Sequence, residues 1–231
     1  MYKNVLLKLS GEALAGDDKK GINNEVLTNV AKVIKDIVNK GVKLSIIVGG
    51  GNFWRGRTSE NMNRVNADYI GMLATIMNGM ALSEALKSVG VKARVLSGLD
   101  INKVCEPYTY RDAIKYLNEG RVLIFVGGTG HPFFSTDTAA ALRGAEMGCE
   151  AILCGKTTDA VYDSDPKTNP NAKKYTQITF DEVLNKNLKV MDGASIAIAR
   201  DNNIKILVFG MDDLNNIKRV INGENVGTII E

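Results

Sequence analysis

The chain has 231 residues, 45% of them hydrophobic and 24% charged, which is enough to bury a large core in a single domain spanning 1–231. The formal net charge is only +3, and the lysines alternate with acidic residues, so the sequence does not predict a nucleic-acid-binding protein. It contains no signal-peptide pattern and no apolar stretch near the roughly 20 residues of a membrane span, which predicts a soluble, cytoplasmic protein with no membrane partner.

Short apolar runs alternate with helical patterns along the whole chain. The runs are rich in β-branched residues, as expected of strands buried on both faces, and cover 5–7, 44–48, 93–96, 122–126, 151–153 and 206–209. The helical patterns cover 24–39, 63–88, 110–118, 137–147 and 193–202. This alternation predicts an α/β fold, a three-layer doubly wound sandwich with a mostly parallel central sheet. The turn-rich segment 163–176 is interpreted as a mobile flap within the same domain.

Glycines gather directly after three of the predicted strands. They are Gly11, the run 49–51 followed by Asn52, and the run 127–130 interrupted by Thr129. The second and third of these loops lead towards a helix, but the first does not. In open α/β sheets the carboxyl ends of the strands form the ligand-binding edge, and glycine loops there expose backbone N–H groups to phosphate. We therefore expect a phosphate-binding edge with the 49–51 loop at its centre.

Two common phosphate motifs are excluded by spacing. Gly155-Lys156-Thr157 resembles the end of a P-loop, but Glu150 stands where the first glycine of that motif belongs. In the two longer glycine loops, the third glycine of a dinucleotide fingerprint would fall at Trp54 and Phe133, which are too bulky for close helix–strand packing. A hydride-transfer enzyme is therefore disfavoured.

A few charged residues sit where phosphate chemistry would need them. Lys8 ends the first strand and can place a compact positive charge beside a phosphoryl group in transfer, although a strand-end lysine without function fits the pattern too. Asp137 and Asp192 each stand at a predicted helix start, where N-capping is the simpler interpretation of either residue. The guanidinium group of Arg55 can donate two parallel hydrogen bonds to phosphate oxygens.

A series of motifs occurs in one order along the chain: Lys8-Leu9-Ser10-Gly11-Glu12-Ala13-Leu14, Gly49-Gly50-Gly51-Asn52-Phe53-Trp54-Arg55-Gly56, Met62-Asn63-Arg64 with Asp68, Gly71-Met72-Leu73-Ala74-Thr75, Gly128-Thr129-Gly130-His131-Pro132-Phe133-Phe134-Ser135-Thr136-Asp137, Asp163-Ser164-Asp165-Pro166 and Lys189-Val190-Met191-Asp192. Together they resemble the bacterial uridylate (UMP) kinases, which have the amino acid kinase fold. The resemblance runs from about residue 3 to the C-terminus.

The resemblance implies transfer of the γ-phosphoryl group of ATP to UMP, giving UDP and ADP in pyrimidine nucleotide biosynthesis. By this resemblance, the residues with catalytic roles are Lys8, Asp137 and Asp192. The residues expected to bind ATP are Lys8, Leu9, Ser10, Gly11, Gly51, Arg55, Lys156, Tyr162 and Asp165. The residues expected to bind UMP are Gly50, Asp68, Thr129, Gly130, His131, Pro132, Phe133, Phe134, Ser135 and Thr136.

The same resemblance implies partners. Mg²⁺ is expected to arrive with ATP rather than at a metal site of the protein. A homohexamer built as a trimer of dimers is expected, with UTP or GTP as a possible effector bound around residues 90–120. The chain departs from the family at His131, where asparagine is usual, and at 157–160, which lacks a glycine.

Two alternatives stay open from the sequence. A kinase of the same fold could phosphorylate a carboxylate or carbamate, as acetylglutamate, aspartate and carbamate kinases do, although Asp68 and the 129–136 loop argue against it. A nucleotide-binding regulator could keep the fold without turnover. It would have no need of Lys8, Asp137 and Asp192, all of which are present.

Overall fold

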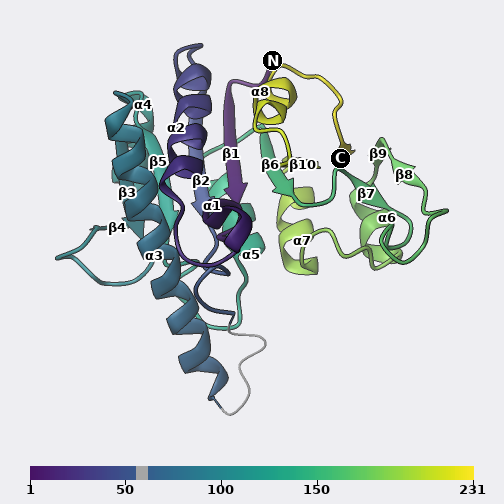
Figure 1. Ribbon diagram of the computed structural model, residues 1–231, viewed down its shortest axis with the longest axis horizontal. Coiled ribbons are helices and arrows are strands. Elements are labelled where there is room, and N and C mark those ends of the chain that lie inside the picture. Colours follow the sequence, from purple (N-terminus) through teal and green to yellow (C-terminus); the bar gives the residue numbers. More distant parts are fainter. Residues whose placement is uncertain (56–61) are drawn as a thin grey trace.

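The computed structural model describes residues 1–55 and 62–231, so Gly56 of the second motif lies outside the described residues. Within them, the central sheet has the strand order β4-β3-β5-β2-β1-β6-β10-β11-β9 (Figure 1). All of its pairs are parallel except β10 with β11, which confirms a mostly parallel sheet. The strands are β1 (Asn4–Leu9), β2 (Lys43–Val48), β3 (Ala93–Ser97), β4 (Glu106–Pro107), β5 (Val122–Val126), β6 (Ala151–Lys156), β9 (Gln177–Ile178), β10 (Lys205–Gly210) and β11 (Thr228–Ile230).

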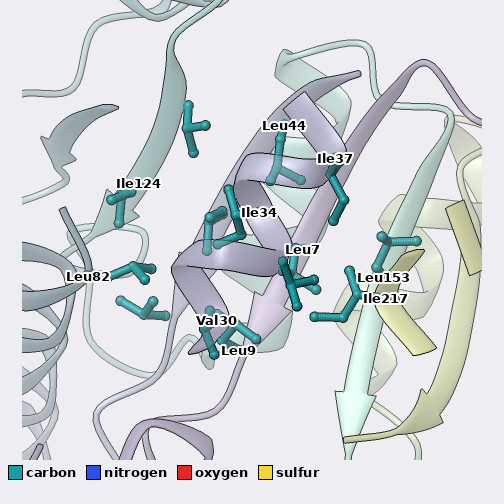
Figure 2. Close-up of a cluster of buried hydrophobic side chains, with 14 of the residues drawn as sticks. Leu7, Leu9, Val30, Ile34, Ile37, Leu44, Leu82, Ile124, Leu153 and Ile217 are labelled. Atoms are coloured by element: carbon teal, nitrogen blue, oxygen red, sulfur yellow. The ribbon is translucent and has the colours of Figure 1, made fainter. Parts of the chain in front are cut away.

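Helices cover both faces of this sheet, each over its own hydrophobic cluster. One face carries α2 (Asn24–Val38), α3 (Arg64–Ser88) and α8 (Asn215–Ile221). The other carries α4 (Tyr110–Asn118), α5 (Thr136–Glu146), α6 (Phe180–Asn185) and α7 (Gly193–Asp201). Figure 2 shows the first cluster, in which Ile34 and Ile37 of α2 lie among Leu7 of β1, Leu82 of α3 and Ile217 of α8. The three-layer doubly wound sandwich is thereby confirmed.

Strand β1 places its residues alternately in the two layers. Val5, Leu7 and Leu9 belong to the cluster under α2, and Leu6 belongs to the cluster under α5. Because successive side chains of a strand point to opposite faces, Lys8 projects to the same side as Leu6, towards α5. The position of the lysine relative to α5 therefore follows from the period of the strand.

The short elements were not expected from the sequence. They are α1 (Glu12–Ala15), the 3-10 helix η1 (Gly16–Asp18), β4, β7 (Val161–Tyr162), β8 (Lys174–Tyr175), β9, α6, α8 and β11. The expectation that the loop at Gly11 does not lead into a helix is wrong, because α1 begins at the next residue. α6 carried a readable signal, since Thr179 and Glu182 form a capping box at its start.

The segment 163–176, interpreted as a flap, is part of a β-hairpin. β8 pairs antiparallel with β7, and the backbone N–H of Asp163 donates to the carbonyl of Lys173 at 3.1 Å. Only Lys174 and Tyr175 of the segment are in a strand, and the rest is turn and loop, as expected. Its closure on ATP stays a prediction. In Figure 1 the hairpin lies at the right-hand end of the molecule, far from α3. Across the described ranges, no helix combines the length and apolar character needed to cross a membrane.

Candidate active site

The carboxyl end of β1 is the point where the sheet changes winding direction. β1 lies between β2 and β6, and the chain reaches β2 through α2 on one face and β6 through α5 on the other. Ligands of open α/β sheets bind at such a switch point. Lys8 stands there, with its Nζ atom 2.5 Å from Oδ1 of Asp137 at the start of α5. The side chain of Lys8 is only 13% exposed.

The surroundings of Lys8 keep it charged. Burial disfavours the ammonium form and by itself lowers the pKa of Lys8, but the electrostatic influence of Cys154, Asp137 and Asp192 and the hydrogen bond to Asp137 outweigh it. The net effect raises the pKa of Lys8 above its ordinary value. Since the ordinary pKa of a lysine already lies well above neutrality, the site holds a fixed positive charge at physiological pH.

Asp137 and Asp192 are joined through the starts of two helices. Ser135 is the N-cap of α5, and its hydroxyl accepts from the backbone N–H groups of Asp137 at 3.0 Å and Thr138 at 3.2 Å. Asp192 is the N-cap of α7 and accepts from the backbone N–H of Ser195 at 2.9 Å. Asp192 also accepts hydrogen bonds from the hydroxyls of Ser135 and Thr138. The capping interpretation of Asp192 is confirmed, and the bonds to α5 bring it beside the Lys8–Asp137 pair.

The first two glycine loops pack backbone against backbone. The N–H of Gly49 donates to the carbonyl of Leu9 at 2.9 Å. A Cβ atom on Gly11 would lie 2.9 Å from both the carbonyl oxygen of Gly49 and the nitrogen of Gly51, closer than real Cβ contacts allow. Glycine at position 11 therefore lets the Ser10–Gly11 loop meet the 49–51 loop beside Lys8.

A hollow of about 360 Å³ opens between the second and third glycine loops and α3. Its lining residues are Gly50, Gly51, Trp54, Arg55, Arg64, Asp68, Gly71, Met72, Thr75, Gly128, Phe134, Ser135 and Thr136. Gly50 is packed so tightly that a Cβ atom would lie 2.7 Å from the carbonyl oxygen of Gly71 and 2.8 Å from Cβ of Ala74. We call this space the first hollow.

Asp68 fixes one end of the third loop against α3. Phe133 has a φ of 72°, an unusual value for a residue with a side chain, and its N–H donates to Oδ2 of Asp68 at 2.8 Å. Nε of Arg64 lies 2.8 Å from both carboxylate oxygens of Asp68, and the guanidinium carbon lies 5.7 Å from the centre of the Phe133 ring. Asp68 thus bridges the first turn of α3 and the strained turn of the loop.

Residues 129–132 of the third loop lie outside the lining of the first hollow. Thr129, Gly130, His131 and Pro132 are not among the described residues that line it. The Thr129 hydroxyl accepts the N–H of His131 at 3.3 Å, a bond within the loop. Phe133 and Phe134 are 64% and 55% exposed. The apolar rings at this rim are available to cover a ligand.

A second hollow of about 450 Å³ lies on the other side of β1, after β6. Its lining residues are Lys156, Thr158, Ala160, Val161, Tyr162, Asp163, Ser164, Asp165, Pro166, Lys186, Asn187, Leu188, Lys189, Val190 and Val208. Lys156 donates to the carbonyl of Val190, and the Tyr162 hydroxyl donates to Oδ1 of Asp159 at 2.8 Å. Oδ1 of Asp165 accepts from the N–H of Lys167 at 2.9 Å, within the turn that forms the outer wall.

The structure places some of the residues expected to bind nucleotides in the lining of these two spaces. Lys156, Tyr162 and Asp165, expected to bind ATP, line the second hollow. Gly51 and Arg55, also expected on the ATP side, line the first hollow together with Gly50. Arg55 forms an ion pair with Glu12, which ties the loop after β2 to the helix after β1. β1 lies between the strands that lead into the two hollows, so Lys8 stands between them in the sheet order.

Sequence reasoning missed some of the lining residues. Arg64 was not singled out as a site residue, although its spacing of four from Asp68 on a predicted helix is the signal of an ion pair on one helix face. Residues 186–188 form the C-cap of α6 and the turn after it, and they line the second hollow through tertiary packing alone. No pattern in the sequence marks them.

Fold and site together define a doubly wound α/β protein that has glycine loops at the switch point of its sheet and a charged lysine held there by an acidic partner. The chain matches the amino acid kinase family over residues 3–210, and it belongs to that family.

Solved structures similar to this chain are UMP kinases. The UMP kinase of Bacillus anthracis is 41% identical with a TM-score of 0.96, over 100% of this chain and 96% of that one. The UMP kinase of Ureaplasma parvum is also 41% identical, with a TM-score of 0.94 over 100% and 99% of the two chains. The uridylate kinase of Archaeoglobus fulgidus is 26% identical, with a TM-score of 0.76 over the full length of both.

Proposed function

We propose that this chain is an ATP-dependent UMP kinase, which transfers the γ-phosphoryl group of ATP to UMP and releases UDP and ADP. The observation that carries the proposal is its 41% identity, over the full length, to two UMP kinases. The expected setting is pyrimidine nucleotide biosynthesis in the cytoplasm.

The two hollows suit the two nucleotides. UMP would occupy the first hollow, with Asp68 and the 129–136 loop at its sugar and base, and its phosphate towards Gly50 and β1. ATP would place its base and ribose in the second hollow, beside Tyr162 and Asp165, and its phosphates over Ser10 and Gly11. The strand order supports this division, because β1 separates the strands that lead to the two hollows.

Charge neutralisation is the main chemical task of the site. The acceptor is already an anionic phosphate, so the transfer needs no general base. The ammonium of Lys8 would lie beside the γ-phosphoryl oxygens, with Asp137 fixing its position through the 2.5 Å ion pair. Asp192 holds the start of α5, where Asp137 lies, by accepting hydrogen bonds from Ser135 and Thr138.

Magnesium would enter with ATP. In the ranges that the structure describes, no group of three His, Cys, Asp or Glu side chains is placed to hold a metal ion. Substrate phosphates are usual ligands of Mg²⁺, so the ion is expected to be carried mainly by ATP. Bound there, Mg²⁺ would add positive charge along the phosphate chain.

The outer face of α3 supports the expected homohexamer. Large apolar residues recur on this face at helical spacing and are 36% to 49% exposed: Tyr69, Ile70, Leu73, Met77 and Met80. A contiguous apolar surface of this kind is typical of contacts between subunits. We infer that α3 packs against a second copy of the chain, and that such dimers build the trimer of dimers.

A nucleotide effector, UTP or GTP, would need a basic site away from both hollows. A depression of about 290 Å³ between the end of α3 and the loop before β4 is lined by Lys87, Arg94 and Lys103. Arg94 and Lys103 fall in the region around 90–120 in which the effector residues are expected, and Glu106, which pairs with Arg94, also lines the depression. We infer that an effector of this class binds there through its phosphates.

The proposed activity is tested by a coupled assay of ADP release with UMP, CMP, TMP, acetylglutamate and aspartate as separate acceptors. Turnover with UMP well above that with each other acceptor is expected. Activity only with acetylglutamate or aspartate as acceptor would instead indicate a kinase of the same fold that phosphorylates a carboxylate. ADP release with no acceptor preference would indicate nucleotide hydrolysis without a kinase function.

A further inference from the structure

Three buried polar side chains lie where α3 meets the glycine loops. Thr75 and Asn78 on α3 are 5% and 0% exposed, and Asn52 after the second glycine loop is 5% exposed. Buried hydroxyl and amide groups destabilise a fold unless they are hydrogen-bonded, so their partners indicate what they hold in place.

The side-chain amides of Asn78 and Asn52 form hydrogen bonds to each other and to neighbouring backbone carbonyls. Nδ2 of Asn78 donates to Oδ1 of Asn52 at 2.7 Å and to the carbonyl of Gly49 at 2.8 Å. Nδ2 of Asn52 donates to Oδ1 of Asn78 at 2.9 Å and to the carbonyl of Gly21 at 2.6 Å. Each amide thereby uses both of its hydrogens. A Cβ on Gly11 would lie 2.2 Å from Oδ1 of Asn52, so the pair also underlies the loop after β1.

Thr75, about one turn earlier on α3, holds the third glycine loop. Its hydroxyl accepts the N–H of Gly127 at 2.8 Å and donates to the carbonyl of Met72 at 2.7 Å. Gly127 has a φ of 71°, and the next residue, Gly128, lines the first hollow. The hydroxyl therefore satisfies a buried N–H at the turn where the loop begins.

We propose that α3 sets the relative position of the two nucleotides through these two contacts. Asn78, acting with Asn52, positions the 49–51 loop against Gly11, where the phosphates of ATP are expected, and the same loop lines the first hollow through Gly50. Thr75 positions the 127–130 loop for UMP. Asn52 and Asn78 are positioning residues, because they act through the loops and line neither hollow among the described residues. The nucleotide named for each loop rests on the proposed function.

The contrast between two nearly isosteric variants tests this proposal. Asn78→Asp removes both donated bonds, and Thr75→Val removes the hydroxyl. Thr75→Ser keeps the hydroxyl, and Ile76→Val alters a buried apolar side chain of the same helix, so both serve as controls. KM for each nucleotide, kcat, the Kd of ATP without acceptor and the thermal unfolding midpoint are measured for every variant. Asn52→Ala provides a second arm if Asn78→Asp does not fold.

Two lost hydrogen bonds correspond to about a tenfold effect, so Asn78→Asp or Asn52→Ala is expected to raise KM and Kd for ATP about tenfold. Thr75→Val is expected to raise KM for UMP about fivefold with KM for ATP unchanged, and Thr75→Ser to restore it. The proposal is overturned if folded variants keep both KM values within twofold, or if Ile76→Val changes them equally. A wild-type protein that binds ATP without phosphorylating UMP refutes the proposed function, while the Kd of ATP still tests the Asn78 contact.

Discussion

The two hollows at the carboxyl edge of the sheet are built in different ways. The first is walled by glycine loops whose backbone packs against α3, with Gly50 in contact with Gly71 and Ala74. The second is walled on its outer side by the β7–β8 hairpin and a turn, held by bonds between exposed side chains such as Tyr162 to Asp159. The first wall thus rests on close packing of backbone, while the outer side of the second rests on side chains at the surface.

This difference indicates where each substrate's specificity resides. A wall of closely packed backbone, as at Gly50, adjusts little, so a substitution there should disturb packing. A wall of exposed side chains can adjust, because each exposed bond contributes little and water can replace it. The UMP side should therefore be strict and sensitive to substitution, and the base-binding part of the ATP side should be tolerant.

The largest loss of activity is expected from a substitution in β1, the strand that separates the two hollows. Lys8→Ala removes the charge placed for the transferring phosphoryl group, so kcat should fall by roughly 100-fold or more, with both KM values changed less. Steady-state kinetics with UMP and ATP provide the measurement. Near-normal turnover would remove Lys8 from the chemistry.

A matched pair of glycines tests the rigidity of the first wall. A Cβ at Gly50 would press on Gly71 and Ala74, so Gly50→Ala should cost about 1–3 kcal/mol of unfolding free energy and raise KM for UMP. At Gly51 the nearest atom to a Cβ is 3.8 Å away, and Gly51→Ala should be tolerated. Chemical unfolding and UMP titration measure both. Equal responses from the two variants would show that the wall is not fixed by packing.

Asp68→Asn tests the bridge between α3 and the third loop with a smaller change. The variant keeps an acceptor for the N–H of Phe133 but loses the charge that pairs with Arg64, so KM for UMP should rise about tenfold and KM for ATP should stay constant. Initial rates at varied UMP measure this. A shift of the same size in KM for ATP would contradict the assignment of Asp68 to the UMP site.

The smallest effect is expected at the second wall. Tyr162→Phe removes one hydrogen bond at the surface, to Asp159, and should change KM for ATP by less than about threefold. The midpoint of thermal unfolding should hardly move. A tenfold loss of ATP affinity would contradict the tolerance assigned to this hollow.

The long elements of the fold could be predicted because their signals are local. Five buried strands and the central strand β1 follow from apolar runs, and α2 to α5 and α7 follow from helical spacing with caps. The edge strands β4, β9 and β11 and the helices α1 and α8 could not, because two to seven residues carry too little periodicity and depend on their neighbours for pairing and packing.

The candidate site was predictable to the extent that glycine loops follow strands. The sequence places Lys8, the glycines and Asp137 at strand or helix ends, and parallel strands bring those ends to one edge. It does not show that Asn78 bonds Gly49 or that Arg55 pairs with Glu12, because these contacts join segments that only the tertiary fold brings together. The placement of Gly51 and Arg55 in the first hollow could not be foreseen for the same reason.

The central claim is that this site passes a phosphoryl group from ATP to UMP. Incubating the full chain with γ-labelled ATP, Mg²⁺ and UMP, and separating the products, tests it most directly. We expect the label in UDP, in amounts equal to the ADP formed, and we expect Lys8→Ala to abolish that transfer over the same period. Label recovered only as inorganic phosphate, or label in UDP unaffected by Lys8→Ala, would contradict the account.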